Sequence, residues 1–142
     1  MSRAVDVILI TGPADDGNVE ELSFWMATAD AADLGRDDTG QGTGPPGDGQ
    51  VGSLLPLNGP VGEDLWGGHK RVIGGVWGAA TANLHWSRFL DRVRDAPWED
   101  PDQVQLLLRD DGDSYFRVYM FVDGELQNVA PQPKDDGFDR PW

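Results

Sequence analysis

The sequence predicts an α+β fold, with a mostly antiparallel sheet of about five strands and two helices packed on one face. The length of 142 residues is that of one ordinary domain. Strand and helix patterns do not alternate strictly along the chain, as a doubly wound sheet would require. The last third of the chain also carries strand patterns separated by short turns, which is typical of an antiparallel meander.

Residues 4–11 predict the first strand. They are rich in β-branched residues, and Gly12 and Pro13 follow as breakers. Because residues 7–10 are continuously apolar, we expect this strand to lie inside the sheet and not at its edge.

Residues 19–34 fit either a helix or a strand. Four apolar side chains recur at helical spacing: Val19, Leu22, Met26 and Ala29. Alternation over residues 22–26 would also fit a strand. The alanines that follow and Gly35 after them favour the helix. We therefore predict a helix, with Asn18 as a possible N-cap and a turn over residues 15–18.

Residues 35–62 are dominated by glycine, proline and aspartate. Between residues 37 and 52 the only apolar side chain is Val51, so little surface could be buried to offset the entropy of ordering the segment. We expect a long mobile loop here, poorly ordered at least over residues 37–50, and an irregular tail over residues 130–142.

The middle of the chain predicts a strand followed by the second helix. The strand pattern over residues 70–82 is interrupted by Gly74 and Gly75, which indicates a bulge or a close backbone approach. A single apolar stripe then follows at helical spacing: Trp86, Phe89, Leu90 and Val93. We expect Asn83 to cap this helix and Pro97 to end it.

Tryptophans flank this second helix on both sides. Their spacing predicts that Trp77, Trp86 and Trp98 anchor the helix on the sheet, in preference to forming an aromatic cage for a ligand.

The clearest pattern in the chain is the meander that begins after Pro101. Apolar residues alternate over residues 104–109, an aspartate-rich turn spans 110–113, and residues 115–122 are aromatic and β-branched. Asp123 and Gly124 are a strong two-residue hairpin signal, and residues 125–129 return as a third strand.

The charge balance constrains the partners of the protein. Eleven basic against 25 acidic residues give a net charge of −14, which disfavours binding to nucleic acid or to anionic membranes. The absence of cysteine excludes disulfides and thiolate metal sites, and we find neither a membrane-spanning run nor an export signal. A cytoplasmic protein is therefore expected.

No catalytic or cofactor motif emerges from the sequence, so an enzyme is disfavoured and no cofactor is expected. There is no P-loop and no nucleophile elbow, and His69 and His85, the only histidines, lack metal-ligand spacing. The aspartates of residues 110–113 resemble a calcium loop only superficially and are interpreted as a hairpin turn. No metal site is predicted.

The acidic surplus leads to our first functional hypothesis, a non-enzymatic interaction protein that binds and neutralises a basic protein, as immunity proteins and inhibitors do. A solvating surface set by genome composition or by salt would give the same surplus. The aspartates expected to meet the partner lie in two turns of the chain: Asp100, Asp102, Asp110, Asp111 and Asp113.

The alternative hypothesis is a small-molecule-binding domain or an uncharacterised enzyme. Its pocket would lie near residues 66–71, where an aromatic and three cationic or titratable side chains interrupt the acidic pattern: Trp66, His69, Lys70 and Arg71. The same residues would also fit a loop that enters a strand, with its charges paired to nearby acids.

Overall fold

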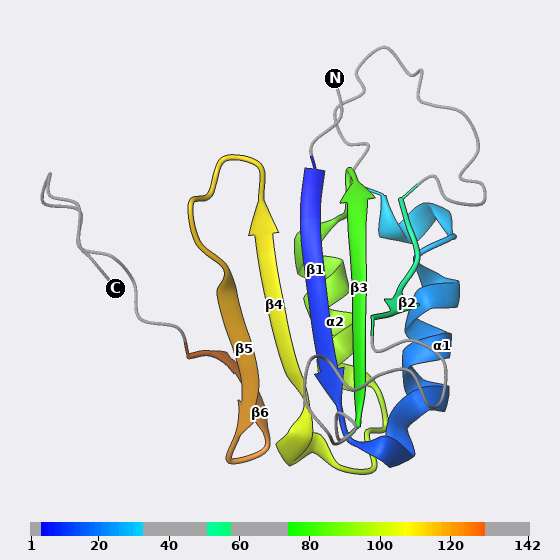
Figure 1. Ribbon diagram of the computed structural model, residues 1–142, viewed down its shortest axis with the longest axis vertical. Coiled ribbons are helices and arrows are strands. Elements are labelled where there is room, and N and C mark those ends of the chain that lie inside the picture. Colours follow the sequence, from blue (N-terminus) through cyan, green and yellow to red (C-terminus); the bar gives the residue numbers. More distant parts are fainter. Residues whose placement is uncertain (1–3, 33–50, 58–73, 130–142) are drawn as a thin grey trace, which may run out of the picture.

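The computed structural model describes residues 4–32, 51–57 and 74–129, and within them six strands form one antiparallel sheet (Figure 1). The spatial order is β2-β3-β1-β4-β5-β6. The strands are β1 (Ala4–Thr11), β2 (Leu55–Pro56), β3 (Gly75–Ala82), β4 (Gln105–Asp110), β5 (Arg117–Val122) and β6 (Glu125–Asn128). The predicted α+β class and meander are confirmed, and the sheet has one strand more than expected.

Strand β1 lies at the centre of the sheet, as its apolar run predicted. It pairs with β3 on one side and with β4 on the other, so that Leu9 lies between Trp77 and Leu106. Every second side chain of β1 is buried, from Val5 to Thr11. This alternation gives the sheet one face that carries the core.

Helix α1 (Asp16–Trp25) begins earlier and ends earlier than the sequence pattern suggested. The 3₁₀ helix η1 (Pro13–Asp15) leads directly into it, so the predicted turn over residues 15–18 was wrong, and Asn18 lies inside the helix instead of capping it. Thr28 ends this helical segment, because its hydroxyl and its backbone N–H both donate to the Trp25 carbonyl. The short 3₁₀ helix η2 (Ala29–Ala31) follows.

Helix α2 (Trp86–Asp95) connects β3 to β4 and carries the predicted apolar stripe. Its N-cap is His85, not Asn83: the His85 Nδ1 accepts from the Arg88 backbone N–H at 3.4 Å. Asn83 instead takes a left-handed conformation with φ of 60°, which asparagine tolerates better than most residues. The helix ends just before Pro97, as expected.

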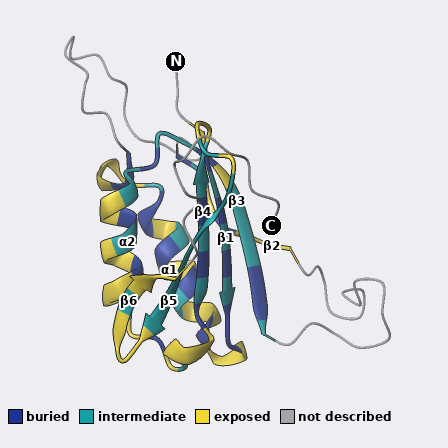
Figure 2. Ribbon diagram, turned by 90° about the vertical axis from the view of Figure 1, so that its left-hand side faces the viewer, coloured by how far each residue is buried: buried dark blue, intermediate teal, exposed yellow. Residues whose placement is uncertain are grey.

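The two helices share one core with the sheet. The rings of Trp25 on α1 and Phe89 on α2 stack with their centres 6.3 Å apart. Both belong to the same buried cluster as Val7 and Leu106. Figure 2 shows buried residues on the strands and on the adjoining sides of the helices. Burial of this apolar surface is the main force that holds the helices on the sheet.

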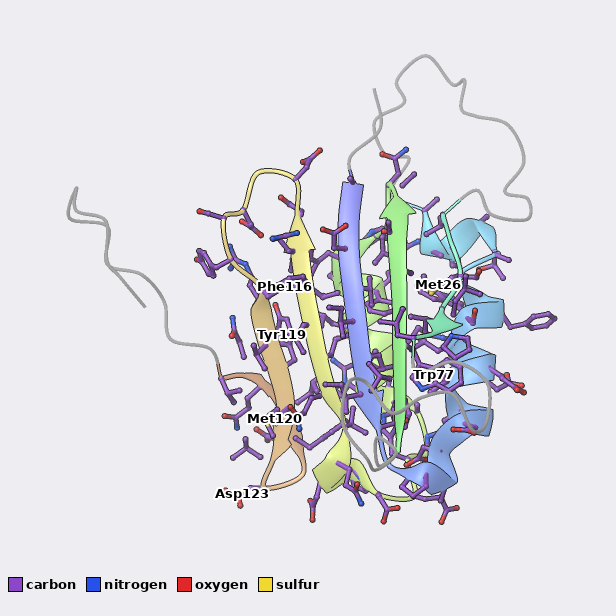
Figure 3. All side chains as sticks on the ribbon, in the orientation of Figure 1. Met26, Trp77, Phe116, Tyr119, Met120 and Asp123 are labelled. Carbon is purple, nitrogen blue, oxygen red and sulfur yellow. The ribbon has the colours of Figure 1, made fainter. Side chains whose placement is uncertain are left out.

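Of the three tryptophans predicted to anchor α2, two form hydrogen bonds that hold this helix, and the third lies beside α1. Trp98 Nε1 donates to the Val93 carbonyl at 2.7 Å, and Trp86 Nε1 donates to the Tyr119 hydroxyl at 3.4 Å, so both contribute to holding α2. Trp77 packs against the shared core, as the prediction of core anchoring requires, but beside α1 side chains. It lines a hollow together with α1 side chains, on the side of β3 that Figure 3 shows nearest to α1.

Residues 51–57 are ordered, although they fall in the segment predicted as a mobile loop. Val51 and Leu54 are buried in the core, and β2 pairs with the outer edge of β3. The prediction missed this strand because only two residues make it and glycines surround them. Residues 37–50, residues 70–73 of the predicted strand and the predicted tail over 130–142 lie outside the described residues.

The close backbone approach predicted for the glycine pair is present at the start of β3. A Cβ on Gly74 would collide with the Thr11 carbonyl oxygen, and one on Gly75 would collide with the Trp77 indole. Gly74 also has a positive φ of 79°. Only glycine combines this conformation with such close contact.

Alanine substitutions at Gly74 and Gly124 distinguish the cost of a positive φ from the cost of a steric collision of the added Cβ. Gly74 and Gly124 both have positive φ, but a Cβ at Gly124 meets nothing within 4 Å. We expect Gly124→Ala to lower the free energy of unfolding by about 1 kcal/mol. Gly74→Ala should lower it by a further ~1–3 kcal/mol from the collision. Urea unfolding measures both, and equal effects would contradict the close approach at Gly74.

Candidate functional site

Asp15 is a fully buried carboxylate that joins two distant parts of the chain. Its Oδ1 accepts from the Glu99 backbone N–H at 2.8 Å and its Oδ2 accepts from the Asp100 N–H at 3.0 Å. The Asn18 amide donates to Oδ1 at 2.8 Å and also to the Pro97 carbonyl at 3.1 Å. The beginning of α1 is thereby tied to the loop between α2 and β4.

The environment of Asp15 favours its ionised form. Burial alone raises the pKa of this carboxyl, but hydrogen bonds from the Glu99 and Asp100 backbone and from Asn18 lower it further than burial raises it. The net pKa is below the ordinary value. Asp15 therefore carries its negative charge inside the fold, with its oxygens occupied.

Around this tie, acidic side chains collect at one end of the sheet. The end of β1, the start of α1, the loop before β4 and the β5–β6 turn all lie at this end (Figure 1). We call the following set the acidic end: Asp16, Glu99, Asp100, Asp102, Asp123 and Glu125. All of them are exposed except Asp100, which is half-buried. Figure 3 labels Asp123 at the tip of the hairpin.

No described arginine compensates these charges, and the described residues include no lysine. Every described arginine is engaged elsewhere. Arg88 pairs with Asp30, and Arg94 pairs with Asp91 and Asp95. Arg109 pairs with Asp6, and Arg117 pairs with Asp113. The Arg92 guanidinium lies over the Trp25 ring, 5.4 Å from its centre. Within the described residues, no basic side chain comes within 4.0 Å of an acidic-end carboxylate. Within the part of the chain that the structure describes, the acidic end is therefore a group of carboxylates without a paired basic side chain.

The structure separates the two aspartate-rich turns predicted to meet a partner. Asp100 and Asp102 belong to the acidic end, whereas Asp110, Asp111 and Asp113 lie at the opposite end of β4. Six residues of extended strand span about 17 Å, so the two groups do not form one surface.

The carboxylates of the β4–β5 turn serve the turn itself. Asp110 Oδ1 accepts from the Gly112 N–H at 2.9 Å, and Asp113 Oδ2 accepts from the Asp110 N–H at 3.3 Å. Asp113 also pairs with Arg117 at 3.4 Å, which raises the pKa of that guanidinium, and Asp111 accepts from the Ala4 N–H. These bonds support the interpretation of residues 110–113 as a hairpin turn.

The residues of the alternative pocket, Trp66, His69, Lys70 and Arg71, lie outside the described residues, so that hypothesis stays a prediction. Within the described ranges, no three metal-ligating side chains group to hold an ion. None of the helices in that same part of the chain has the length and apolar content needed to cross a membrane.

Sequence reasoning missed most of the acidic end. Asp16 was interpreted as part of a turn over residues 15–18, Glu99 was given no role, and Asp123 and Glu125 were interpreted only as parts of a hairpin. The signal that could have found them is topological. An antiparallel meander returns the β5–β6 turn to the end at which β4 begins.

Comparisons of the chain with protein-family models, with curated proteins and with solved structures gave no match.

Asp15→Asn tests the hydrogen bonds that join the start of α1 to the loop before β4. The amide keeps the size of the side chain but turns an NH₂ toward a backbone N–H, so we expect a loss of about 1–3 kcal/mol in the free energy of unfolding. Chemical unfolding at neutral pH measures this loss. An unchanged midpoint would contradict the role of Asp15.

The pH dependence of stability gives a second test of Asp15. Because its pKa is lowered in the folded state, its contribution is complete above the unfolded pKa of about 4 and is lost as the pH falls through the folded pKa. The difference in unfolding free energy between wild type and Asp15→Asn should therefore shrink below pH 4. A difference that grows with acid would contradict the lowered pKa.

Proposed function

We propose that the protein is a non-enzymatic interaction protein that binds and neutralises a basic protein partner through the acidic end, as an inhibitor or immunity protein would. The observation that supports the proposal is a set of carboxylates at one end of the sheet that pair with none of the described arginines, each of which is engaged elsewhere. A surplus that only served solubility would need no such separation of charge.

The chemistry of the acidic end suits a surface rich in arginine and lysine. Backbone segments from four parts of the fold present the carboxylates, and Asp15 fixes two of those segments relative to each other. Charge-assisted hydrogen bonds from arginine and lysine to carboxylates are stronger than those between neutral groups. Their combined field also accelerates encounter with a cationic partner and repels anionic ones.

Neutralising variants with equal changes in charge test this proposal. Asp102→Asn with Asp123→Asn removes two charges from the acidic end, and Asp30→Asn with Asp111→Asn removes two elsewhere. The asparagine at 123 should be tolerated, because Asp123 has a φ of 53° and asparagine accepts that conformation. Each protein is immobilised and exposed to a lysate of the source cell at low salt, and retained proteins are identified by mass spectrometry.

We expect wild type and the control variant to retain the same basic protein, and the acidic-end variant to retain at least about tenfold less. Elution at raised ionic strength should release it. If no basic protein is retained by the wild type, or if both variants lose it equally, the proposal is wrong.

A further inference from the structure

We propose that the basic partner inserts an apolar side chain into a hollow beside Phe24 on α1. This inference rests on the proposed function and adds an apolar anchor to it. Charged contacts set much of the rate and selectivity of an encounter, whereas a few side chains buried in well-packed pockets carry much of the binding energy at protein interfaces.

Phe24 is the first observation. Its exposed fraction of 76% is the highest among the large hydrophobic side chains of the described residues. The neighbouring Leu22, Trp25 and Met26 are all buried, so Phe24 lies on the opposite side of α1 from the core. The next most exposed large hydrophobics, Leu55 at 62% and Leu57 at 49%, belong to the β2 segment. Leu55 and Leu57 line a different hollow, together with Ile8 and Phe116, so of these three side chains Phe24 alone lines the hollow described next.

The second observation is a hollow of about 330 Å³ between α1 and the segment that contains β2. Its lining is mostly apolar: Val19, Glu20, Ser23, Phe24, Ala27, Ser53, Leu54 and Trp77. Ser23 Oγ accepts from the Leu54 backbone N–H at 3.0 Å, which joins the two walls. The hollow is therefore formed before any partner binds, and an aliphatic side chain would bury apolar surface there.

The third observation is that Phe24, in the lining of the hollow, lies on the same face of α1 as Asp16 of the acidic end. Asp16, Glu20 and Phe24 follow one another at four-residue intervals, so they lie along one exposed stripe of α1. Residues 4–32 contain no lysine or arginine. Glu20 is the one charged residue in the lining of the hollow. The occupant that fits is a lysine- and arginine-rich segment with an apolar residue, whose basic side chains meet Glu20 and Asp16.

Two synthetic peptides test the inference. One is a lysine- and arginine-rich helix former with a single central leucine, and the other has alanine in place of that leucine. We expect the leucine peptide to bind the wild-type protein about tenfold more tightly at low salt. Isothermal titration calorimetry measures both affinities.

Three variants localise this preference. Phe24→Ala removes one wall of the hollow, and Ala27→Leu fills the hollow without changing any charge; both should abolish the preference for leucine. Val122→Ala changes an exposed hydrophobic at the hairpin and should leave the preference intact. Circular dichroism establishes that each variant is folded. In the wild type, the Trp77 indole N–H signal, assigned by its loss in Trp77→Phe, should shift with the leucine peptide and shift less with the alanine peptide.

Equal affinities for the two peptides, or a leucine preference that survives in both Phe24→Ala and Ala27→Leu, would overturn the anchor. Salt-sensitive binding of both peptides in that case would leave the proposed function standing. Failure of both peptides to bind at low salt would overturn the electrostatic interaction itself, and the anchor with it.

Discussion

The buried Asp15 carboxylate is the interaction on which this end of the molecule depends. It lies where η1 leads into α1, and it accepts two backbone hydrogen bonds from the loop that leaves α2. A buried charge is costly unless its oxygens are occupied, and here the same bonds that satisfy the charge also fix the loop. The loop in turn sets the start of β4 and the positions of Glu99 and Asp100. The buried Asp15 carboxylate thus fixes the backbone that carries two acidic residues of the acidic end, Glu99 and Asp100.

The placement of the arginines matters as much as that of the acids. Arg109 bonds to Asp6 at 2.9 Å and lies over the Phe116 ring, on the sheet face opposite the core, where Figure 3 labels Phe116 and Met120. Arg94 is held by Asp91 and Asp95 at the end of α2. Such exposed pairs add little stability. Their consequence is electrostatic, because the carboxylates in these pairs are neutralised by arginine, whereas no described arginine pairs with the carboxylates of the acidic end.

The sequence predicted those parts of the fold in which local pattern and tertiary contacts agree. The run at Val7–Ile10 placed β1 inside the sheet, and the Asp123–Gly124 turn gave the last hairpin. Prediction from the sequence failed for segments whose structure depends on tertiary contacts. Asp15 looked like a turn residue because its partners lie more than eighty positions away, and residues 51–57 looked like loop because β3, not their own composition, orders them. The candidate site was predicted only in part: Asp100 and Asp102 belong to it, but grouping them with Asp110 required knowing which end each turn occupies.

In the function proposed above, the apolar core forms the scaffold, and the acidic end together with the exposed face of α1 contacts the basic partner. The most direct measurement is a titration of isotopically labelled protein with the retained basic protein, followed by amide chemical shifts. We expect the largest shifts at residues 16–24, 99–102 and 123–125. Shifts confined to residues 110–113, or to the sheet face that carries Phe116 and Met120, would contradict this expectation.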